Sequence, residues 1–438
     1  MTPRGSWTFA VSHQIELLVA GAVALVGGVG LVGQQASAPA SHPVSMVFDT
    51  FTPGPCSATG GLHGGCDPGK LVRVRLATVA TGLVRPWAIA FLPDSRSTML
   101  VTEMPGRLRV VRDGKLDPQP VPGWTGPALQ AISLFSVAVH PQFAQNQFLY
   151  LSYTKGTAER STMALARAKF DGAKLSDVKE IFVADAWGTG AAAGRAKFGP
   201  DGMLYLTVGD RDNQVFTENN SSRVHAQDLA SHVGKVLRLR DDGTAAPDNP
   251  FVKKPGAKPE IYTYGHRNVH GLAWHPDTRE LWAVEIGPMG GDELNVLKPG
   301  ANYGWPHVSL GRIYTGSTVS NESWFRPGME MPQMFWVPAI SPSSLAFYTG
   351  DRIPLWKGHI FIGGLSGQQV QRLAFNQPLP QQERRESMFV SMDTRFRDVV
   401  MGPDGYLYLA TEKTGQNGPG SARNDSADGT ILRLEPAS

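Results

Sequence analysis

Short apolar runs separated by turn residues fill most of the chain, and one arrangement of them recurs. Each copy has a few apolar residues, a turn that in most copies contains Pro with Asp or Gln, and a second apolar run. Apolar runs of this length around such a turn predict β-hairpins. The six copies pair residues 87–94 with 99–102, 137–142 with 148–153, 196–202 with 204–208, 271–274 with 280–284, 344–347 with 359–363, and 399–405 with 406–411.

Six copies of one hairpin predict an all-β protein, a six-bladed β-propeller over residues 72–438. A single hairpin cannot bury both of its faces, and a radial array of hairpins also protects the strand edges. The alternative is a large irregular β-sandwich. The gaps at residues 213–233 and 309–338 predict long loops, and functional sites form on loops held by a rigid scaffold. We therefore expect the site at the mouth of the central channel.

The N-terminal residues predict export. Residues 17–32 form an uncharged apolar run, shorter than the roughly 20 residues of a membrane-spanning helix, and Ala36-Ser37-Ala38 has the small-x-small form of a cleavage site. Residues 1–38 are interpreted as a secretory signal peptide, or otherwise as an uncleaved signal anchor. Either case places the body in the periplasm or outside the cell.

Residues 39–71 form a leader rich in Pro and Gly that contains both cysteines of the chain, Cys56 and Cys66. The two cysteines flank a nine-residue glycine-rich loop that closes easily, so we expect a disulfide in an oxidising compartment. The 49 Gly and 33 Pro residues agree with many turns between short strands. The net charge of +3, without any Lys/Arg block, indicates no nucleic-acid partner.

Polar segments flank the fourth hairpin. Gly265-His266-Arg267-Asn268 precedes it, and this combination of a cation, an amide and an imidazole suits a planar anionic or carbonyl-rich ligand. After it, residues 287–293 read GPMGGDE, in which glycines leave backbone carbonyls accessible beside carboxylates. Carbonyl and carboxylate oxygens are the ligands that Ca²⁺ takes.

Five ordered strings resemble the soluble glucose/sorbosone dehydrogenase family, over nearly the whole chain after residue 72. They are GPDGMLYLTVGDR (199–211), HVGKVLRLRDDG with PDNPF (232–251), YGHRN (264–268), GGDELNVLKPGANYGWP (290–306) and RFRDVVMGPDGYLYL (395–409). The resemblance implies a six-bladed propeller that uses pyrroloquinoline quinone (PQQ) and Ca²⁺. It also implies oxidation of an aldose sugar at C1 to the lactone, with hydride passing to Ca²⁺-activated PQQ and then electrons to an external acceptor.

The resemblance assigns cofactor residues by position. Arg267 and Asn268 match an Arg-Asn pair near the quinone oxygens, and Arg267 would also balance the charge that develops on reduction. Arg395 and Arg397 match the pair that grips PQQ, and residues two apart lie on one face of a strand.

Metal and catalytic residues are assigned in the same way. Gly287 and Pro288 match the backbone carbonyls that ligate the calcium ion of the cofactor. Glu293 and Tyr303 fall where some relatives bind a second, structural Ca²⁺ through backbone oxygens. Asp210 matches the carboxylate that orients the catalytic base.

The sequence departs from the family at three positions. The family's catalytic base is a His three residues before a Gly-Arg pair, and here the pair is Gly194-Arg195 and the base position is Ala191. A Gln that contacts PQQ aligns with Ala131, although Gln130 is adjacent. A cofactor-binding Lys of some members falls near Ser366. The base is therefore unassigned, and the imidazoles that could replace it are His140, His225, His232, His266 and His270.

Three functional hypotheses remain. The first is an exported PQQ- and Ca²⁺-dependent dehydrogenase acting on an aldose sugar or a related aldehyde or polyol. The second is a catalytically impaired propeller that binds a carbohydrate or a protein partner through the same mouth. The third is a lactonase-like hydrolase, which requires a central metal ringed by Asp, Asn and Glu side chains. Membrane association is expected only if the leader is an uncleaved anchor.

Overall fold

The computed structural model describes residues 46–52, 70–93, 97–126, 128–212, 222–319, 324–375, 383–413 and 426–437. The predicted signal peptide and the Cys56–Cys66 disulfide lie outside these residues. In the described residues, regular structure is almost entirely β-strand, as predicted. The helical segments there are α1 (Phe143–Asn146) and the 3-10 turns η1 (Arg223–Gln227), η2 (Pro354–Trp356) and η3 (Val390–Met392). None of them is long and apolar enough to span a bilayer.

The strands form six antiparallel sheets, here called blades 1 to 6. Blade 1 contains β3 (Pro86–Phe91), β4 (Thr98–Glu103), β5 (Arg107–Arg112) and β6 (Lys115–Leu116). Blade 2 contains β7 (Ala131–Val139), β8 (Phe148–Gly156), β9 (Ser161–Phe170) and β10 (Leu175–Val183). Blade 3 contains β11 (Ala193–Phe198), β12 (Leu204–Val208), β13 (Lys235–Leu239) and β14 (Ile261–Tyr264).

Blades 4 and 5 repeat the four-stranded pattern. Blade 4 contains β15 (Val269–Trp274), β16 (Leu281–Glu285), β17 (Asp292–Leu297) and β18 (Met334–Trp336). Blade 5 contains β19 (Pro342–Phe347), β20 (Ile360–Gly364), β21 (Val370–Phe375) and β22 (Glu383–Met388). Blade 6 has five strands, β23 (Thr394–Met401), β24 (Leu407–Lys413), β25 (Gly429–Pro436), β2 (Lys70–Leu83) and β1 (Met46–Thr52).

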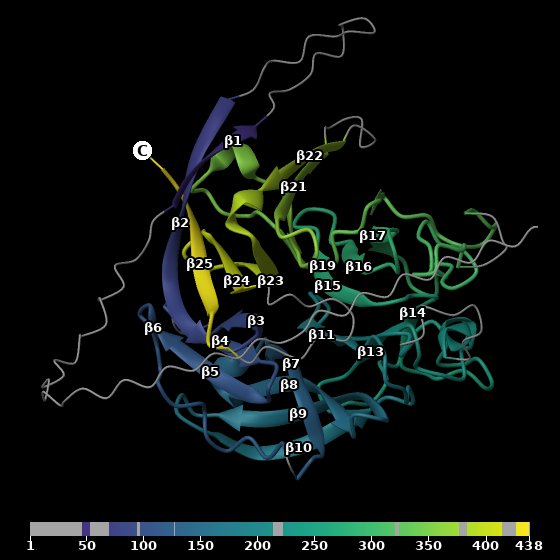
Figure 1. Ribbon diagram of the computed structural model, residues 1–438. Helices are drawn as coiled ribbons and strands as arrows, with labels where there is room; N and C mark the ends of the chain where they lie inside the picture. The colour runs from purple at the N-terminus through teal and green to yellow at the C-terminus, as the bar shows by residue number, and fades with distance from the viewer. Residues whose placement is uncertain are drawn as a thin grey trace, which may run out of the picture. The chain divides into compact units, whose positions relative to one another are not determined.

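The blades are arranged around the first strand of each blade. These strands, β3, β7, β11, β15, β19 and β23, contact one another in cyclic order, and β23 returns to β3. They surround the centre of the ring in Figure 1. Each of the six hairpins predicted from the sequence is the first strand pair of one blade. The six-bladed propeller is therefore confirmed.

Blade 6 closes the ring with strands from both parts of the chain. The long strand β2 pairs with β25, and Leu76 lies opposite Leu434. On its other edge β2 pairs with β1. The closing sheet thus includes β1 and the first two residues of β2, which precede residue 72, where we expected the propeller to begin.

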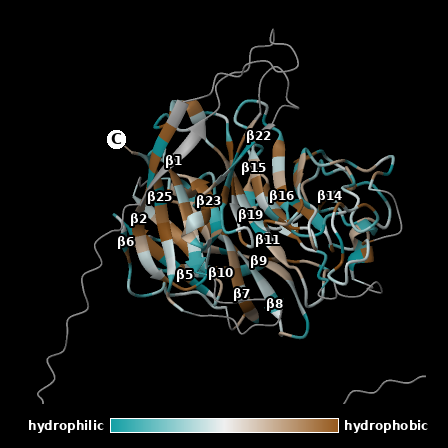
Figure 2. Cartoon of the chain, turned by 45° about the horizontal axis from the view of Figure 1, so that its top comes forward, coloured by the Kyte–Doolittle hydropathy of each residue, from teal (hydrophilic) through white to brown (hydrophobic). Residues whose placement is uncertain are grey.

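Apolar side chains fill the spaces between neighbouring blades. Six clusters of buried residues form most of the core of the described chain, and each joins two or three adjacent sheets. The cluster between blades 6 and 1, for example, packs Tyr408 and Ile431 against Ile89 and Val101. Figure 2 shows the hydrophobic residues following the strands. Because every blade has apolar residues on both faces, no blade could bury its surface alone.

The two predicted long loops contain some regular structure. Residues 309–338 include β18, and the described part of 213–233 includes η1. The sequence pattern missed β18 because a strand of three residues is too short to show a period of two. The remainder of 309–333, in the described part, is irregular, as predicted.

The first strands of the blades run in the same direction along the channel. Their last residues converge on one cavity, which is lined from all six blades. At the other end of the channel, where these strands begin, lie the predicted site residues. The channel therefore has two chemically different ends.

We expect Leu434→Ala to destabilise the propeller strongly. Leu434 is 1% exposed, packs in a cluster that joins blades 5 and 6, and lies opposite Leu76 in the closing sheet. A buried Leu→Ala substitution costs about 2–5 kcal/mol of unfolding free energy. Urea denaturation of the two proteins measures the difference. The control is Lys179→Ala on the exposed edge of blade 2, and an equal effect of both variants would contradict the assigned packing.

Candidate active site

The predicted site residues gather at the end of the channel where the first strands begin. Arg267 and Asn268 immediately precede β15 of blade 4, and Arg395 and Arg397 lie at the start of β23 of blade 6. Asp210 follows β12 of blade 3, and Gly287 and Pro288 connect β16 to β17. Three blades thus supply these side chains, and the closed ring brings them together.

Arg395 and Arg397 share one carboxylate, that of Glu412. Glu412 lies opposite Arg395 on β24, and its Oε1 is 3.1 Å from Arg395 Nε. The same oxygen accepts hydrogen bonds from Arg397 Nε at 2.9 Å and from its terminal nitrogen at 2.7 Å. Both arginines therefore lie on one face, as predicted. Two guanidinium groups and one carboxylate leave a net positive charge, and burial together with the charge of Arg397 lowers the pKa of Arg395 to about 10.

Arg267 is held mainly by backbone groups. Its amide N–H donates to Glu285 Oε2 at 2.9 Å, and its guanidinium donates to the carbonyls of Ile286 and Gly287 at 2.8 and 2.7 Å. The guanidinium also lies over the ring of Trp305, 5.7 Å from its centroid. Its charge therefore has no carboxylate partner among the described salt bridges, so it adds to the positive potential of this end of the channel.

Several buried polar atoms at this end make no hydrogen bond. They are Nε of Arg267, Oδ1 of Asn268, Nε of Arg395 and Oε2 of Glu412. Buried polar groups in proteins are almost always paired. The two unpaired arginine donors, together with the excess positive charge, fit a planar, polycarboxylate ligand such as PQQ, whose carboxylates accept from arginine.

Gly287, Pro288, Glu293 and Tyr303 line one small cavity of about 10 Å³, together with Arg267. The two calcium positions implied by the resemblance are thus neighbours around a single space. In the described chain no three His, Cys, Asp or Glu side chains converge on a metal site, so any cation here would depend on backbone carbonyls. The hydroxyl of Tyr303 donates to Val296 O and accepts from the N–H of Lys298, and it plays a structural role.

Asp210 is fully buried and has a partner on each oxygen. Its Oδ1 accepts from the backbone N–H of Asp212 at 3.0 Å, and its Oδ2 accepts from Trp305 Nε1 at 2.9 Å. The indole thus takes the hydrogen bond that the resemblance reserves for an imidazole. Burial raises the pKa of Asp210 to about 7, against the opposing effect of Arg267.

Ala191 lies beside this carboxylate. Its carbonyl accepts from the backbone N–H of Arg211 at 3.1 Å, and a Cβ on Gly209 would lie 2.1 Å from the same oxygen. Gly209 therefore permits the close approach of the segment before β11 to the end of β12. The base position that the resemblance implies therefore lies next to the segment of Asp210, but a methyl group occupies it.

Four of the five candidate imidazoles are engaged or remote from this end. His266 bonds Thr263 and Glu285 through its two ring nitrogens, and His232 bonds the Asp185 N–H and Glu260. His140 follows the last residue of β7, at the opposite end of the channel. His225 is half exposed on η1 and contacts Asp228.

His270 is different, because no hydrogen bond to its ring nitrogens exists in the described chain. Its ring lies 6.2 Å from that of Trp87 between ring centroids. Burial, followed by the charges of Arg397, Arg195 and Arg267, lowers its pKa to about 3. The neutral form of the His270 imidazole is therefore favoured.

Sequence reasoning also missed residues that build this site. Glu412 and Glu285 bond the arginines, and Trp305 bonds Asp210. For the two glutamates, the signal in the sequence was a charged residue inside an otherwise apolar strand. Asp292, considered as a metal carboxylate, instead accepts from the backbone N–H groups of Gly287, Ile340 and Ser341. Gln130 is exposed before β7, and no hydrogen bond joins its side chain to the arginines.

Comparison with known proteins gives a consistent result. A family model described as Glucose / Sorbosone dehydrogenase matches residues 83–419. An uncharacterized protein of Synechocystis sp., slr1608, is 40% identical over 83% of this chain and 86% of its own length. Aldose sugar dehydrogenase YliI of Escherichia coli is 35% identical over 83% of this chain and 93% of its own. The PQQ-bound aldose sugar dehydrogenase of Streptomyces coelicolor superposes with a TM-score of 0.65, at 27% identity, over 90% of this chain and 99% of its own.

We expect Asp210→Asn to flatten the pH dependence of stability. The pKa of Asp210 is about 7 in the folded protein and 3.8 when exposed, so the folded state binds the extra proton between these values. Stability is then lost as pH rises from about 4 to 7, by at most about 1.4 kcal/mol per pH unit from this group. Asparagine does not titrate, so the substitution removes this contribution to the pH dependence of stability.

The measurement is urea denaturation at pH 5 and pH 8 for the protein, for Asp210→Asn and for the exposed control Asp171→Asn. The stability difference between the two pH values should shrink only in Asp210→Asn. An unchanged difference in that variant would show that Asp210 is ionised throughout this range.

Proposed function

Because the chain belongs to the glucose/sorbosone dehydrogenase family, we propose that it oxidises an aldose sugar, or a related aldehyde or polyol, at C1 to the lactone with PQQ and Ca²⁺. The observation that carries the proposal is the arginine cluster at the channel end, with its excess positive charge and unpaired polar atoms. This cluster suits an anionic quinone and has no evident use in a purely structural ring.

Four side chains are suited to hold PQQ. Arg395 and Arg397 would donate hydrogen bonds to its carboxylates on the side facing away from Glu412, and Arg267 with Asn268 would lie near the quinone oxygens. The bound quinone would supply the hydride acceptor. Charge-assisted hydrogen bonds from fixed guanidinium groups favour the negative charge that develops on reduction, and here the guanidiniums are already positioned by Glu412 and backbone carbonyls.

Calcium is proposed at the carbonyls of Gly287 and Pro288. Asp292 anchors this loop through the N–H of Gly287 at 2.8 Å, which fixes the direction of the backbone. The Gly287 carbonyl already accepts from Arg267, but a carbonyl oxygen has two lone pairs. Glu293 and Tyr303 border the same cavity and are proposed as further contributors through backbone oxygens.

His270 is proposed as the group that accepts the proton from the anomeric hydroxyl. Its neutral form is favoured by burial and by the charges of Arg397 and Arg267, and no hydrogen bond engages its ring nitrogens among the described residues. Its low pKa depends on the neighbouring positive charges, and the carboxylates of PQQ would offset them. Cofactor binding would thereby raise the basicity of His270 when the substrate is present.

The alternative is an impaired propeller that binds a carbohydrate or protein partner without oxidising it. The observation in its favour is Ala191, because loss of a general base usually costs a hundredfold or more in rate. A lactonase-like function is disfavoured, since the described chain does not gather the side-chain carboxylates that such a metal site needs.

The same proposal includes export. The apolar run at residues 17–32 and the Ala36-Ser37-Ala38 site support a periplasmic or secreted enzyme. PQQ-dependent oxidation there requires an external electron acceptor. A membrane attachment is proposed only if the leader is retained as an anchor.

We expect the full-length protein to bind PQQ in the presence of Ca²⁺, and glucose to bleach the quinone absorbance. Arg395→Gln should weaken PQQ binding by about ten- to hundredfold, the usual value of a hydrogen bond to a charged group. The exposed Arg240→Gln is the matched control. Binding without bleaching would favour the impaired propeller, and no binding at all would contradict the cofactor assignment.

We expect His270→Gln to lower kcat by about a hundredfold while PQQ affinity changes only a few-fold, because the imidazole acts in proton transfer. Ala191→His should increase turnover in the His270→Gln background by restoring a base beside Asp210. The measurements are steady-state sugar oxidation and the PQQ titration of each variant. Unchanged turnover in His270→Gln would exclude this imidazole as the proton acceptor.

A further inference from the structure

A second cavity, of about 510 Å³, lies at the end of the channel opposite to the arginine cluster. Its wall is formed by the final residues of the first strand of every blade, at 89–91, 137–139, 196–198, 271–274, 344–347 and 398–401. Small-molecule sites typically enclose about 300–1,000 Å³. The cavity is therefore large enough for a ligand of the size of a single aromatic acid.

The inner part of this cavity contains an ion pair that is internally satisfied. Arg195 lies 3.2 Å from Asp398, and both side chains are buried. The second oxygen of Asp398 accepts from the backbone N–H of Ile89 at 2.8 Å. Arg195 also donates to the carbonyls of His270 and Ser343. Neither partner has charge left over for a ligand.

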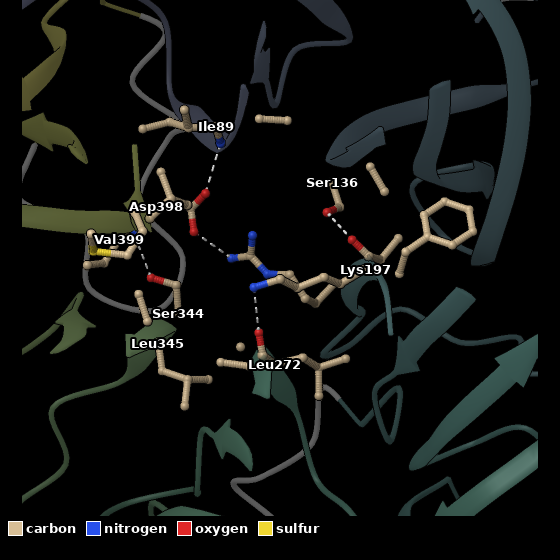
Figure 3. A pocket seen from close by; sticks show the side chains of 18 of the residues that line it. Ile89, Ser136, Lys197, Leu272, Ser344, Leu345, Asp398 and Val399 are labelled. Carbon is tan, nitrogen blue, oxygen red and sulfur yellow. Dashed lines mark hydrogen bonds and ion pairs between the residues drawn. The ribbon is translucent and has the colours of Figure 1, made fainter. Parts of the chain in front are cut away.

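Lys197, in contrast to Arg195, has no carboxylate partner among the described residues. It lies two residues after Arg195 on β11, and its amine donates to the carbonyl of Leu272 at 3.2 Å. Figure 3 shows its side chain extending from one wall across the cavity to the carbonyl of Leu272. No salt bridge in the described chain includes Lys197. An ammonium group has three donors, so two remain for a ligand.

The surroundings of Lys197 disfavour an isolated positive charge. The residue is exposed to the cavity but lies within the channel, and burial by the walls, followed by the charge of Arg195, lowers its pKa to about 8. Asp398 opposes this shift only in part. A bound anion would stabilise the ammonium form and restore its pKa toward the ordinary value.

The rest of the wall is largely apolar. The aromatic residues Phe91, Phe198, Trp274 and Phe347 line it from blades 1, 3, 4 and 5, with aliphatic residues between them. The hydroxyl of Ser136 bonds the carbonyl of Ala196, and that of Ser344 accepts from the N–H of Val399. One free cation within apolar walls is suited to a ligand with one negative charge and an apolar body.

We propose that this cavity is a second ligand site, which binds a small monocarboxylate with an aromatic or alicyclic body through Lys197. The carboxylate would accept two hydrogen bonds from the ammonium group, and the body would pack against the aromatic wall. A phosphate dianion is a poorer match, because the nearby guanidinium is already paired with Asp398. The site is separate from the proposed sugar oxidation and does not depend on it.

The test is calorimetric titration of the full-length protein with benzoate. Lys197→Met, which keeps the length of the side chain but removes the charge, should weaken benzoate binding by about ten- to hundredfold. Lys197→Arg should retain binding within a few-fold, and the exposed Lys179→Met is the matched control. Thermal unfolding of each variant shows whether the fold is retained.

Three ligand comparisons on the unmodified protein keep the test independent of the variants. Benzyl alcohol lacks the charge and acetate lacks the body, so each should bind at least tenfold more weakly than benzoate, and inorganic phosphate should also bind more weakly. Reductive methylation with ¹³C should show the pKa of Lys197 rising when benzoate is present. Absent benzoate binding, equal affinity in Lys197→Met, or tighter binding of benzyl alcohol or phosphate would overturn the proposal.

Discussion

Arg195 connects more blades than any other side chain discussed above. From β11 in blade 3 it reaches the carbonyl of His270 in blade 4 at 2.8 Å, the carbonyl of Ser343 in blade 5 at 3.1 Å and Asp398 in blade 6 at 3.2 Å. Its guanidinium also lies over the ring of Trp87 in blade 1, 4.2 Å from the centroid. Removing one partner of such a buried pair leaves the other charge uncompensated, which costs about 3–5 kcal/mol. The relative positions of the first strands, and hence of both channel ends, depend on this contact.

The two ends of the channel differ in how their charges are compensated. At the end with Arg267, Arg395 and Arg397, Glu412 is shared by two guanidinium groups and Glu285 accepts from the backbone N–H of Arg267, while burial favours the neutral form of Asp210. At the other end, Asp398 neutralises Arg195 and a single ammonium group remains. The first arrangement suits a ligand with several negative charges, and the second suits a ligand with one. Because the charges of the two ends are compensated in different ways, the two ends are suited to different ligands.

The fold could be predicted from the sequence because the same hairpin pattern recurs along the chain. Six copies of the same hairpin gave the number of blades, although single copies such as residues 344–363 were degenerate. Outer strands such as β18 were not predicted because they are short and irregular in sequence. The closing pair β2–β25 was not predicted because it joins segments about 350 residues apart. Local patterns carry no information on such pairings. For the site, Arg395 and Arg397 were found on one face as their spacing implied, but their shared partner Glu412 lies on the next strand, and only the register shows the contact.

The residues proposed for proton transfer and those proposed for cofactor binding are different in this chain. Glu412, Glu285 and backbone carbonyls position the arginines, whereas Ala191 contributes only its carbonyl to the packing against Arg211. A methyl group at position 191 therefore leaves the arginine cluster intact, and Trp305 satisfies the oxygen of Asp210 that faces away from Asp212. Because position 191 contributes no side-chain contact to this framework, a histidine is not needed there to keep the arginine cluster in place. The proton acceptor can then lie elsewhere on the channel wall, and His270 meets the two requirements of a neutral imidazole and proximity to Arg267.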